Sequence, residues 1–210
     1  MNIEGLIKRH REFREVEFKK HKDLFLELVK KGQRPKTLFI GCSDSRVIPT
    51  LITGAGPGDL FVLRVVGNFV PPFEPDDDYH AAASAIEYAV TVLNVENIIV
   101  CGHSHCGACE SLYKKLPEGE ELIHTRKWLE LGKPAKDAAL RECPESGKEE
   151  LLRLTERYSV LVQLENLLTY PAVKRGVDEN RIYLHGWYYR IEDGEIEYYD
   201  STKKAFLPLT

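Results

Sequence analysis

Short apolar runs alternate with amphipathic segments along this chain of 210 residues. Apolar side chains recur at helical spacing over residues 3–31 and stop at a glycine, which predicts an N-terminal helical arm. Three continuous apolar runs, at residues 37–42, 60–66 and 97–102, have the length and composition of buried strands. Helical patterns fall between or after these strands, over residues 79–94, 107–116, 120–131 and 148–169.

The last part of the chain has the pattern of a β-hairpin. Residues 181–190 and 196–199 are rich in aromatic side chains and flank an Asp-Gly turn. Buried strands that alternate with helices indicate a parallel sheet, to which the hairpin adds an antiparallel strand. We therefore predict an α/β fold: a mostly parallel mixed β-sheet with an antiparallel edge strand, flanked by helices. Without repeats or linkers, residues 1–210 are predicted to form a single domain, with residues 1–31 as its arm.

Composition narrows the class of protein. The 29 basic and 33 acidic residues leave a net charge of -4, which argues against a nucleic-acid partner. Five cysteines cannot all pair within one chain, and this is typical of a reducing compartment. The arm is too polar for a secretory signal, and no apolar run reaches the roughly 20 residues of a membrane span. We therefore expect a cytoplasmic protein with no membrane span.

Side chains with metal-binding chemistry lie where two of the predicted strands end. Cys42, Asp44 and Arg46 belong to the end of the first strand, and His103 and Cys106 follow the third. Ligands of an open parallel sheet bind beyond the carboxyl ends of its strands, so neighbouring strands would bring these groups together. Two thiolates and an imidazole favour zinc, with a fourth position open as in catalytic sites. Asp44 either fills that position or pairs with Arg46 and leaves it to water.

The cysteine spacing also fits an iron–sulfur cluster. Cys101, Cys106 and Cys109 have the spacing of plant-type cluster ligands, with Cys42 or Cys143 as a fourth. Because Cys101 ends an apolar run, we expect its side chain in the core and not in a cluster loop. The cluster would also leave the acidic and basic residues after the first strand without a role, and zinc is therefore favoured.

These motifs resemble those of the β-class carbonic anhydrases, in particular the bacterial type. The resemblance extends from about residue 24 to residue 200 and rests on six segments: 41–47, 57–64, 67–68, 84–89, 102–107 and 185–187. It implies one Zn²⁺ per chain with Cys42, His103 and Cys106 as ligands, and Asp44 as a further ligand only in a closed state. It also implies that Asp44 and Arg46 form a catalytic dyad.

The resemblance implies a lyase reaction, the reversible hydration of CO₂ to bicarbonate and a proton. Zinc-bound hydroxide would attack CO₂ in a small pocket whose walls include Val47 and Gly102, while the dyad orients the hydroxide. Regulation by bicarbonate is implied at Arg64 and at the position of Phe39. Members regulated in this way tend to carry Trp where this chain has Phe39, so this regulation stays open.

The resemblance further implies self-association as a dimer or higher assembly, in which the N-terminal helices embrace a partner. Two other functions remain open on the same residues. One is hydrolysis of CS₂ or COS on the same scaffold, and the other is a zinc-binding structural module without turnover. The intact dyad argues against the structural module, because structural zinc needs neither Asp44 nor Arg46.

Overall fold

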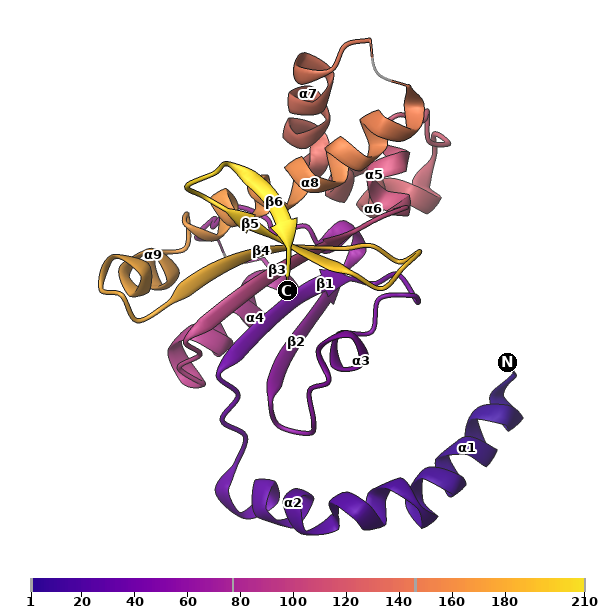
Figure 1. Cartoon of the computed structure of the whole chain (residues 1–210), viewed down its shortest axis with the longest axis vertical. Helices are drawn as coiled ribbons and strands as arrows, with labels where there is room; N and C mark the ends of the chain where they lie inside the picture. Colours follow the sequence, from indigo (N-terminus) through magenta and orange to yellow (C-terminus); the bar gives the residue numbers. More distant parts are fainter. Residues whose placement is uncertain (1, 77, 146, 210) are drawn as a thin grey trace.

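A six-stranded mixed sheet organises the chain (Figure 1). The computed structural model describes residues 2–76, 78–145 and 147–209. The strand order is β2-β1-β3-β4-β5-β6, in which β1 to β4 run parallel and β5 and β6 are antiparallel. The strands are β1 (Thr37–Cys42), β2 (Leu60–Val65), β3 (Asn97–His103), β4 (Tyr183–Tyr189), β5 (Ile196–Asp200) and β6 (Ala205–Pro208).

Helices connect the parallel strands, as right-handed βαβ crossovers require. The α-helices are α1 (Ile3–Glu15), α2 (Glu17–Lys31), α3 (Pro49–Thr53), α4 (Ala81–Glu87), α5 (Gly107–Ser111), α6 (Ile123–Leu129), α7 (Lys133–Glu142), α8 (Lys148–Leu167) and α9 (Pro171–Asp178). The long helix α8 packs on β3 and β4 in the centre of the sheet. Across the described residues, none of the helices combines the length and apolar character needed to cross a membrane.

The two faces of the sheet bury different clusters, because successive side chains of a strand point to opposite sides. Leu38 and Ile40 of β1 join the main core with residues of α4, α8 and α9. Phe39, between them in sequence, lies on the other face with Ile99 and Cys101 of β3. This second face is packed by α3 and by aromatic residues of β4. The central strands are therefore buried on both sides, which accounts for their continuous apolar runs.

The predicted fold class is confirmed, with differences at the ends of elements. The strand over residues 37–42 has its predicted bounds, and the predicted hairpin is β4 and β5. A short strand, β6, adds a second antiparallel strand that was not expected; it ends in Pro208, which an edge tolerates. The predicted helix over 79–94 begins at Ala81 and changes at Tyr88 into a π-helical turn.

Helices α7 and α9 were not predicted, although both have a proline at one of the first two helical positions, where it favours the first turn. The predicted helix over 107–116 ends at Ser111. The helical arm expected over residues 1–31 consists of two helices, α1 and α2, which meet at Val16.

The two helices of the arm extend away from the sheet and its covering helices (Figure 1). No residue of Ile3–Glu15 or Glu17–Lys31 is buried. Apolar side chains therefore face solvent along the arm, and Val29, for example, is 82% exposed. An isolated helix pair with unburied apolar side chains gains little stability from packing, so this arm has the surface expected of an element that packs on another chain.

The close approach of α8 to β3 leaves little room for a side chain at Gly102, and this can be tested. A Cβ at this position would lie 2.6 Å from Val160 Cγ2 and 3.3 Å from the Glu156 carbonyl oxygen. We predict that Gly102→Ala lowers the free energy of unfolding by about 1–3 kcal/mol, because the packed interface must shift. Urea denaturation of the metal-free protein measures this loss. Gly107→Ala is the control, since its Cβ meets nothing within 4 Å; equal losses in both variants would contradict the packing argument.

Candidate metal centre

The parallel pairing of β1 with β3 brings the predicted ligands together. Gly41 pairs with Cys101 in the register of these strands, so Cys42 ends β1 beside the point where β3 continues to His103. Cys106 follows three residues later, directly before α5. The sulfur atoms of Cys42 and Cys106 and a ring nitrogen of His103 lie within 4.8 Å of one another, and all three residues are buried.

The imidazole of His103 is arranged as a metal ligand. Its Nδ1 lies 2.8 Å from the main-chain oxygen of Ser104. A carbonyl oxygen only accepts hydrogen bonds, so Nδ1 carries the proton and Nε2 keeps its lone pair. Nε2 is buried and has no hydrogen-bond partner among the described residues. A buried acceptor without a partner is unfavourable, and a metal ion beside the two thiols would satisfy it. The donor set therefore fits zinc.

The thiols of Cys42 and Cys106 have raised pKa values that a bound cation would lower. The hydrogen bond with the Cys106 thiol, together with burial, raises the pKa of Cys42 to about 12. The pKa of Cys106 is raised too, first by its hydrogen bond with the Cys109 thiol. A bound divalent cation reverses this balance, because a coordinating thiol is deprotonated outright. Two main-chain N–H groups, of Asp44 and Gly67, lie 3.4 Å from Cys42 Sγ and would stabilise its thiolate.

The carboxylate of Asp44 is held by Arg46. Arg46 Nε donates to Oδ1 at 2.9 Å and Nη2 donates to Oδ2 at 2.7 Å, and the Arg46 main-chain N–H donates to Oδ1 as well. These hydrogen bonds hold the pKa of the Asp44 carboxyl well below its usual range. The ligand cluster found in the described part of the chain contains the two cysteines and the histidine without Asp44. Asp44 therefore lies outside this cluster and is paired with Arg46 instead.

Arg64 and His105 fix the surroundings of this carboxylate. Arg64, on β2, donates to the main-chain oxygens of Cys42 at 3.1 Å and of Asp44 at 2.6 Å. Arg46 donates to the main-chain oxygen of His105 at 3.0 Å. His105 has a φ of 56°, in the left-handed region. The two arginines therefore tie the segment after β1 to β2 and to the segment after β3.

Comparisons with known proteins agree with this geometry. A family model described as carbonic anhydrase matches residues 37–196. The chain belongs to the carbonic anhydrase family. It is 43% identical over 205 residues to a carbonic anhydrase of Synechocystis. The aligned segment covers 98% of this chain and 72% of that protein. The structure of the β-carbonic anhydrase CcaA has a TM-score of 0.92 and 40% identity, covering 99% of this chain and 92% of that one. A tetrameric β-carbonic anhydrase of Sordaria macrospora has a TM-score of 0.80 and 28% identity, covering 93% and 95%. The β class expected from the motifs is thereby confirmed.

Three of the other predicted site residues of this carbonic anhydrase, Phe39, Val47 and Gly102, are buried, whereas Arg64 is exposed. Val47 is fully buried. Gly102 is buried and lies close to α8. Phe39 is fully buried, offers no hydrogen-bond donor, and meets the ring of Trp187 edge-on at 6.4 Å between centroids. Arg64 donates hydrogen bonds from Nε and Nη2 to the main-chain oxygens of Cys42 and Asp44. Regulation by bicarbonate at Phe39 and Arg64 stays a prediction.

The structure does not assemble the alternative iron–sulfur site. Cys101 lies on the opposite face of the sheet, in the cluster of Phe39, whereas Cys106 and Cys109 pack with Cys42. The candidate ligand cluster within the described residues includes neither Cys101 nor Cys109. Cys101, on β3, is thus packed in a different cluster from Cys106 and Cys109, which follow the strand in the turn and in α5.

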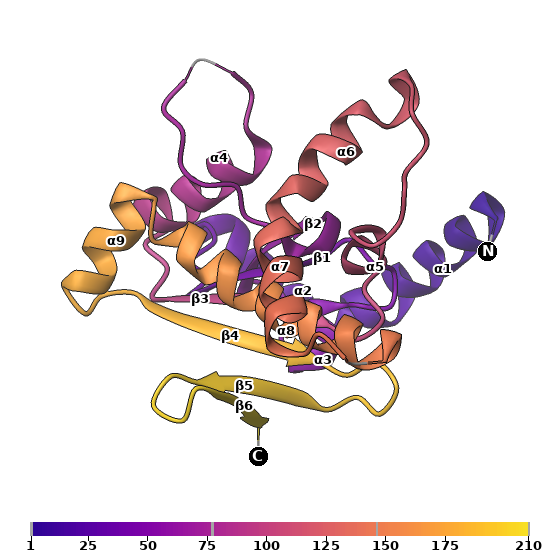
Figure 2. The ribbon, with the colours of Figure 1, turned by 90° about the horizontal axis from the view of Figure 1, so that it is seen from above.

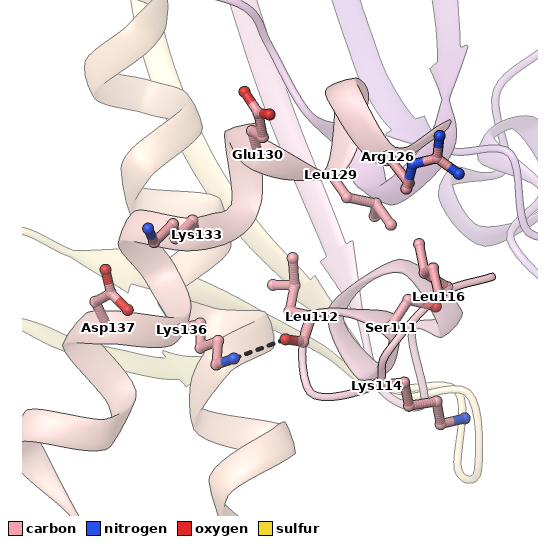
Figure 3. Close-up of a pocket in the computed structure, with 10 residues that line it drawn as sticks. All are labelled: Ser111, Leu112, Lys114, Leu116, Arg126, Leu129, Glu130, Lys133, Lys136 and Asp137. Atoms are coloured by element: carbon pink, nitrogen blue, oxygen red, sulfur yellow. Dashed lines mark hydrogen bonds between the residues drawn. The ribbon is translucent and has the colours of Figure 1, made fainter. Parts of the chain in front are cut away.

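Two cavities lie near the sheet ends. The larger, 1230 Å³, is lined by Ser43 beside the centre and by residues of the segment before α4 and of α6, which project on the same side in Figure 2. The smaller, 310 Å³, lies among α5, α6 and α7 (Figure 3). Its lining includes no predicted site residue, and Lys136 there donates a hydrogen bond to the Leu112 main-chain oxygen. The larger cavity therefore extends to the residue that follows Cys42 in sequence.

A buried carboxylate beneath the centre was not found from the sequence. Glu156 of α8 accepts a hydrogen bond from the main-chain N–H of Cys106 at 2.9 Å. Its position on the inner face of α8, beside Thr155 and Ser159, interrupts the apolar pattern of that helix. A polar residue on an inner helix face signals a buried partner, but the sequence alone could not name a partner 50 residues away.

The Asp44–Arg46 pair leads to a direct prediction. Replacing Arg46 by Gln removes the charged donors, so the pKa of the Asp44 carboxyl should rise by about one to three pH units. Carbon-13 NMR of the labelled carboxyl, titrated with acid in the metal-free protein, measures this pKa. Arg181→Gln, which removes the exposed partner of Glu179, serves as the control. An Asp44 titration that is identical in the wild type and in Arg46→Gln would refute the assigned role of Arg46.

Proposed function

We propose that this carbonic anhydrase binds one Zn²⁺ per chain through Cys42, His103 and Cys106 and catalyses the reversible hydration of CO₂. The observation that carries the proposal is the buried Nε2 of His103, which has its lone pair available within 4.8 Å of both thiols. Three protein ligands leave a fourth position, which distinguishes catalytic from structural zinc sites. The family and the fold support the same reaction.

Each side chain around the centre has a different role in the reaction. Zinc, when bound, supplies a Lewis acid that makes water acidic enough to act as a nucleophile near neutral pH. Asp44 accepts a hydrogen bond from the attacking water and thereby directs a lone pair toward CO₂. Arg46 holds Asp44 ionised and oriented, which prevents this carboxylate from taking the fourth position. Val47 offers an apolar wall against which uncharged CO₂ can lie.

The arm and the composition support two further parts of the proposal. We infer that the enzyme self-associates as a dimer or higher assembly, with α1 and α2 at the interface, because neither helix buries a residue within its own chain. The Sordaria macrospora relative is tetrameric. We place the enzyme in the cytoplasm, since its five cysteines are all free thiols and thiols persist in reducing compartments.

The test is stopped-flow CO₂ hydration, measured together with the zinc content of the same samples. We expect the wild type to hydrate CO₂ with about one zinc per chain, faster at alkaline pH because the attacking water must lose a proton. Asp44→Asn should keep its zinc and lose about 10²–10⁴-fold in rate. Asp178→Asn, which alters an exposed pair with Lys174, is the matched control and should match the wild type.

Three outcomes would count against the proposal. A zinc-loaded wild type that hydrolyses COS or CS₂ but hydrates CO₂ negligibly would assign a different substrate. Full activity in Asp44→Asn would remove the dyad from the mechanism. A chain that binds zinc and turns over none of these substrates would be a structural zinc module.

A further inference from the structure

A buried carboxylate lies directly behind one of the metal ligands. The side chain of Glu156 is 2% exposed, and both of its oxygens are in use. Oε1 accepts hydrogen bonds from the Cys106 main-chain N–H at 2.9 Å and from Arg153 Nη2 at 2.7 Å. Oε2 accepts one from the Tyr188 hydroxyl at 2.7 Å. Glu156 thus links α8, β4 and the start of α5 at a single point.

This arrangement is costly for the fold. Burial disfavours the charged form and raises the pKa of Glu156. Its partner Arg153 is also largely buried, and its Nε and Nη1 have no hydrogen-bond partner within the described residues. Replacing buried ion pairs by apolar residues is often neutral or stabilising. Stability alone therefore gives little reason for a carboxylate at this position.

The backbone at Cys106 does give a reason. His105, immediately before it, adopts the left-handed region with a φ of 56°, which is unfavourable for a residue other than glycine. The Cys106 N–H lies in a buried turn between β3 and α5, outside both ladders of hydrogen bonds. Glu156 Oε1 satisfies this N–H, and in this turn the Cys106 thiol lies within 4.8 Å of the ligand atoms of Cys42 and His103.

We propose that Glu156 is a positioning residue for the metal ligand Cys106, acting through the hydrogen bond to its main-chain N–H. The inference rests on the proposed zinc site, and it extends that site to α8. Groups that orient a metal ligand change the affinity for the metal, typically by about 10- to 100-fold when they are removed. Glu156 has no contact with substrate in this role, and its effect reaches the reaction through the geometry of Cys106.

The chain contains a matched control for this role. Glu197, on β5, is also a buried carboxylate bound by an arginine, since Arg157 donates to both of its oxygens at 2.9–3.0 Å. Glu197 Oε1 also lies 3.7 Å from Arg190 Nη1. Neither of these arginines belongs to the ligand cluster or to the dyad. Replacing Glu197 therefore removes a buried carboxylate without touching a metal ligand.

The experiment measures zinc affinity by competition with a chromophoric chelator, in the wild type, Glu156→Met and Glu197→Met, with thermal unfolding of each. Met matches Glu in length and accepts no hydrogen bond from a main-chain N–H of comparable strength. We expect Glu156→Met to lower zinc affinity about 10- to 100-fold, and Glu197→Met to keep wild-type affinity while losing stability. Glu156→Gln should recover much of the affinity, because its amide oxygen can still accept from the Cys106 N–H.

A second readout covers the case in which Glu156→Met does not fold. The visible absorption bands of the cobalt(II)-substituted protein report ligand geometry. We expect them to shift in Glu156→Asp, whose shorter side chain draws the carboxylate away from the Cys106 N–H, and to stay unchanged in Glu197→Asp. Unchanged bands in Glu156→Asp, or equal zinc affinities in the two Met variants, would overturn the positioning role. A wild type that binds no zinc would instead refute the proposed function.

Discussion

The parallel, in-register pairing of β1 with β3 is the constraint on which the rest of the site depends. Cys42 ends one strand and His103 ends the other, and only side-by-side strands bring these two positions together across 61 residues of chain. A slip of one residue would move one of these two positions by about 3.3 Å along the strands. The buried apolar runs that fix this register therefore also fix the positions of these candidate metal ligands.

Two kinds of support stabilise the segments that leave the strands. Arginines on the exposed side, Arg46 and Arg64, bind the Asp44 carboxylate and main-chain oxygens. On the buried side, Glu156 binds a main-chain N–H of the opposite segment. The two arginines thus donate to main-chain oxygens, and the carboxylate of Glu156 accepts from a main-chain N–H. Each charged side chain therefore meets a main-chain group of opposite partial charge. The pKa values of the Cys42 and Cys106 thiols between them are raised, and a bound cation would lower both.

Local patterns in the sequence were sufficient for five of the six strands and for the group of candidate ligands. The run at Thr37–Cys42 predicts its strand with the right bounds, because a strand buried on both faces leaves no polar positions inside it. Cys42, His103 and Cys106 follow from the rule that ligands gather at the carboxyl ends of parallel strands. The strand β6 and the helix α9 escaped prediction, since short elements carry too few residues for a periodic signal.

Contacts between distant segments could not be predicted in the same way. Arg64 reads in the sequence as one residue of an apolar strand, and only the pairing of β2 with β1 directs it to the Cys42 main-chain oxygen. Glu156 reads as a polar position of an amphipathic helix, and only the packing of α8 on β3 places it behind Cys106. Both roles consist of hydrogen bonds to main-chain atoms. Because residues of nearly every type carry the same main-chain atoms, the sequence of the partner segment does not indicate these bonds.

X-ray absorption at the zinc edge of the zinc-loaded enzyme tests the central claim most directly, because it reports the ligands of the metal itself. With Cys42 and Cys106 as the sulfur ligands and His103 as the imidazole, the spectrum should contain two sulfur atoms at about 2.3 Å and two nitrogen or oxygen atoms at about 2.0–2.1 Å. Three or four sulfur atoms per zinc would contradict the account, since Cys109 would then have joined the centre and the open position would be lost.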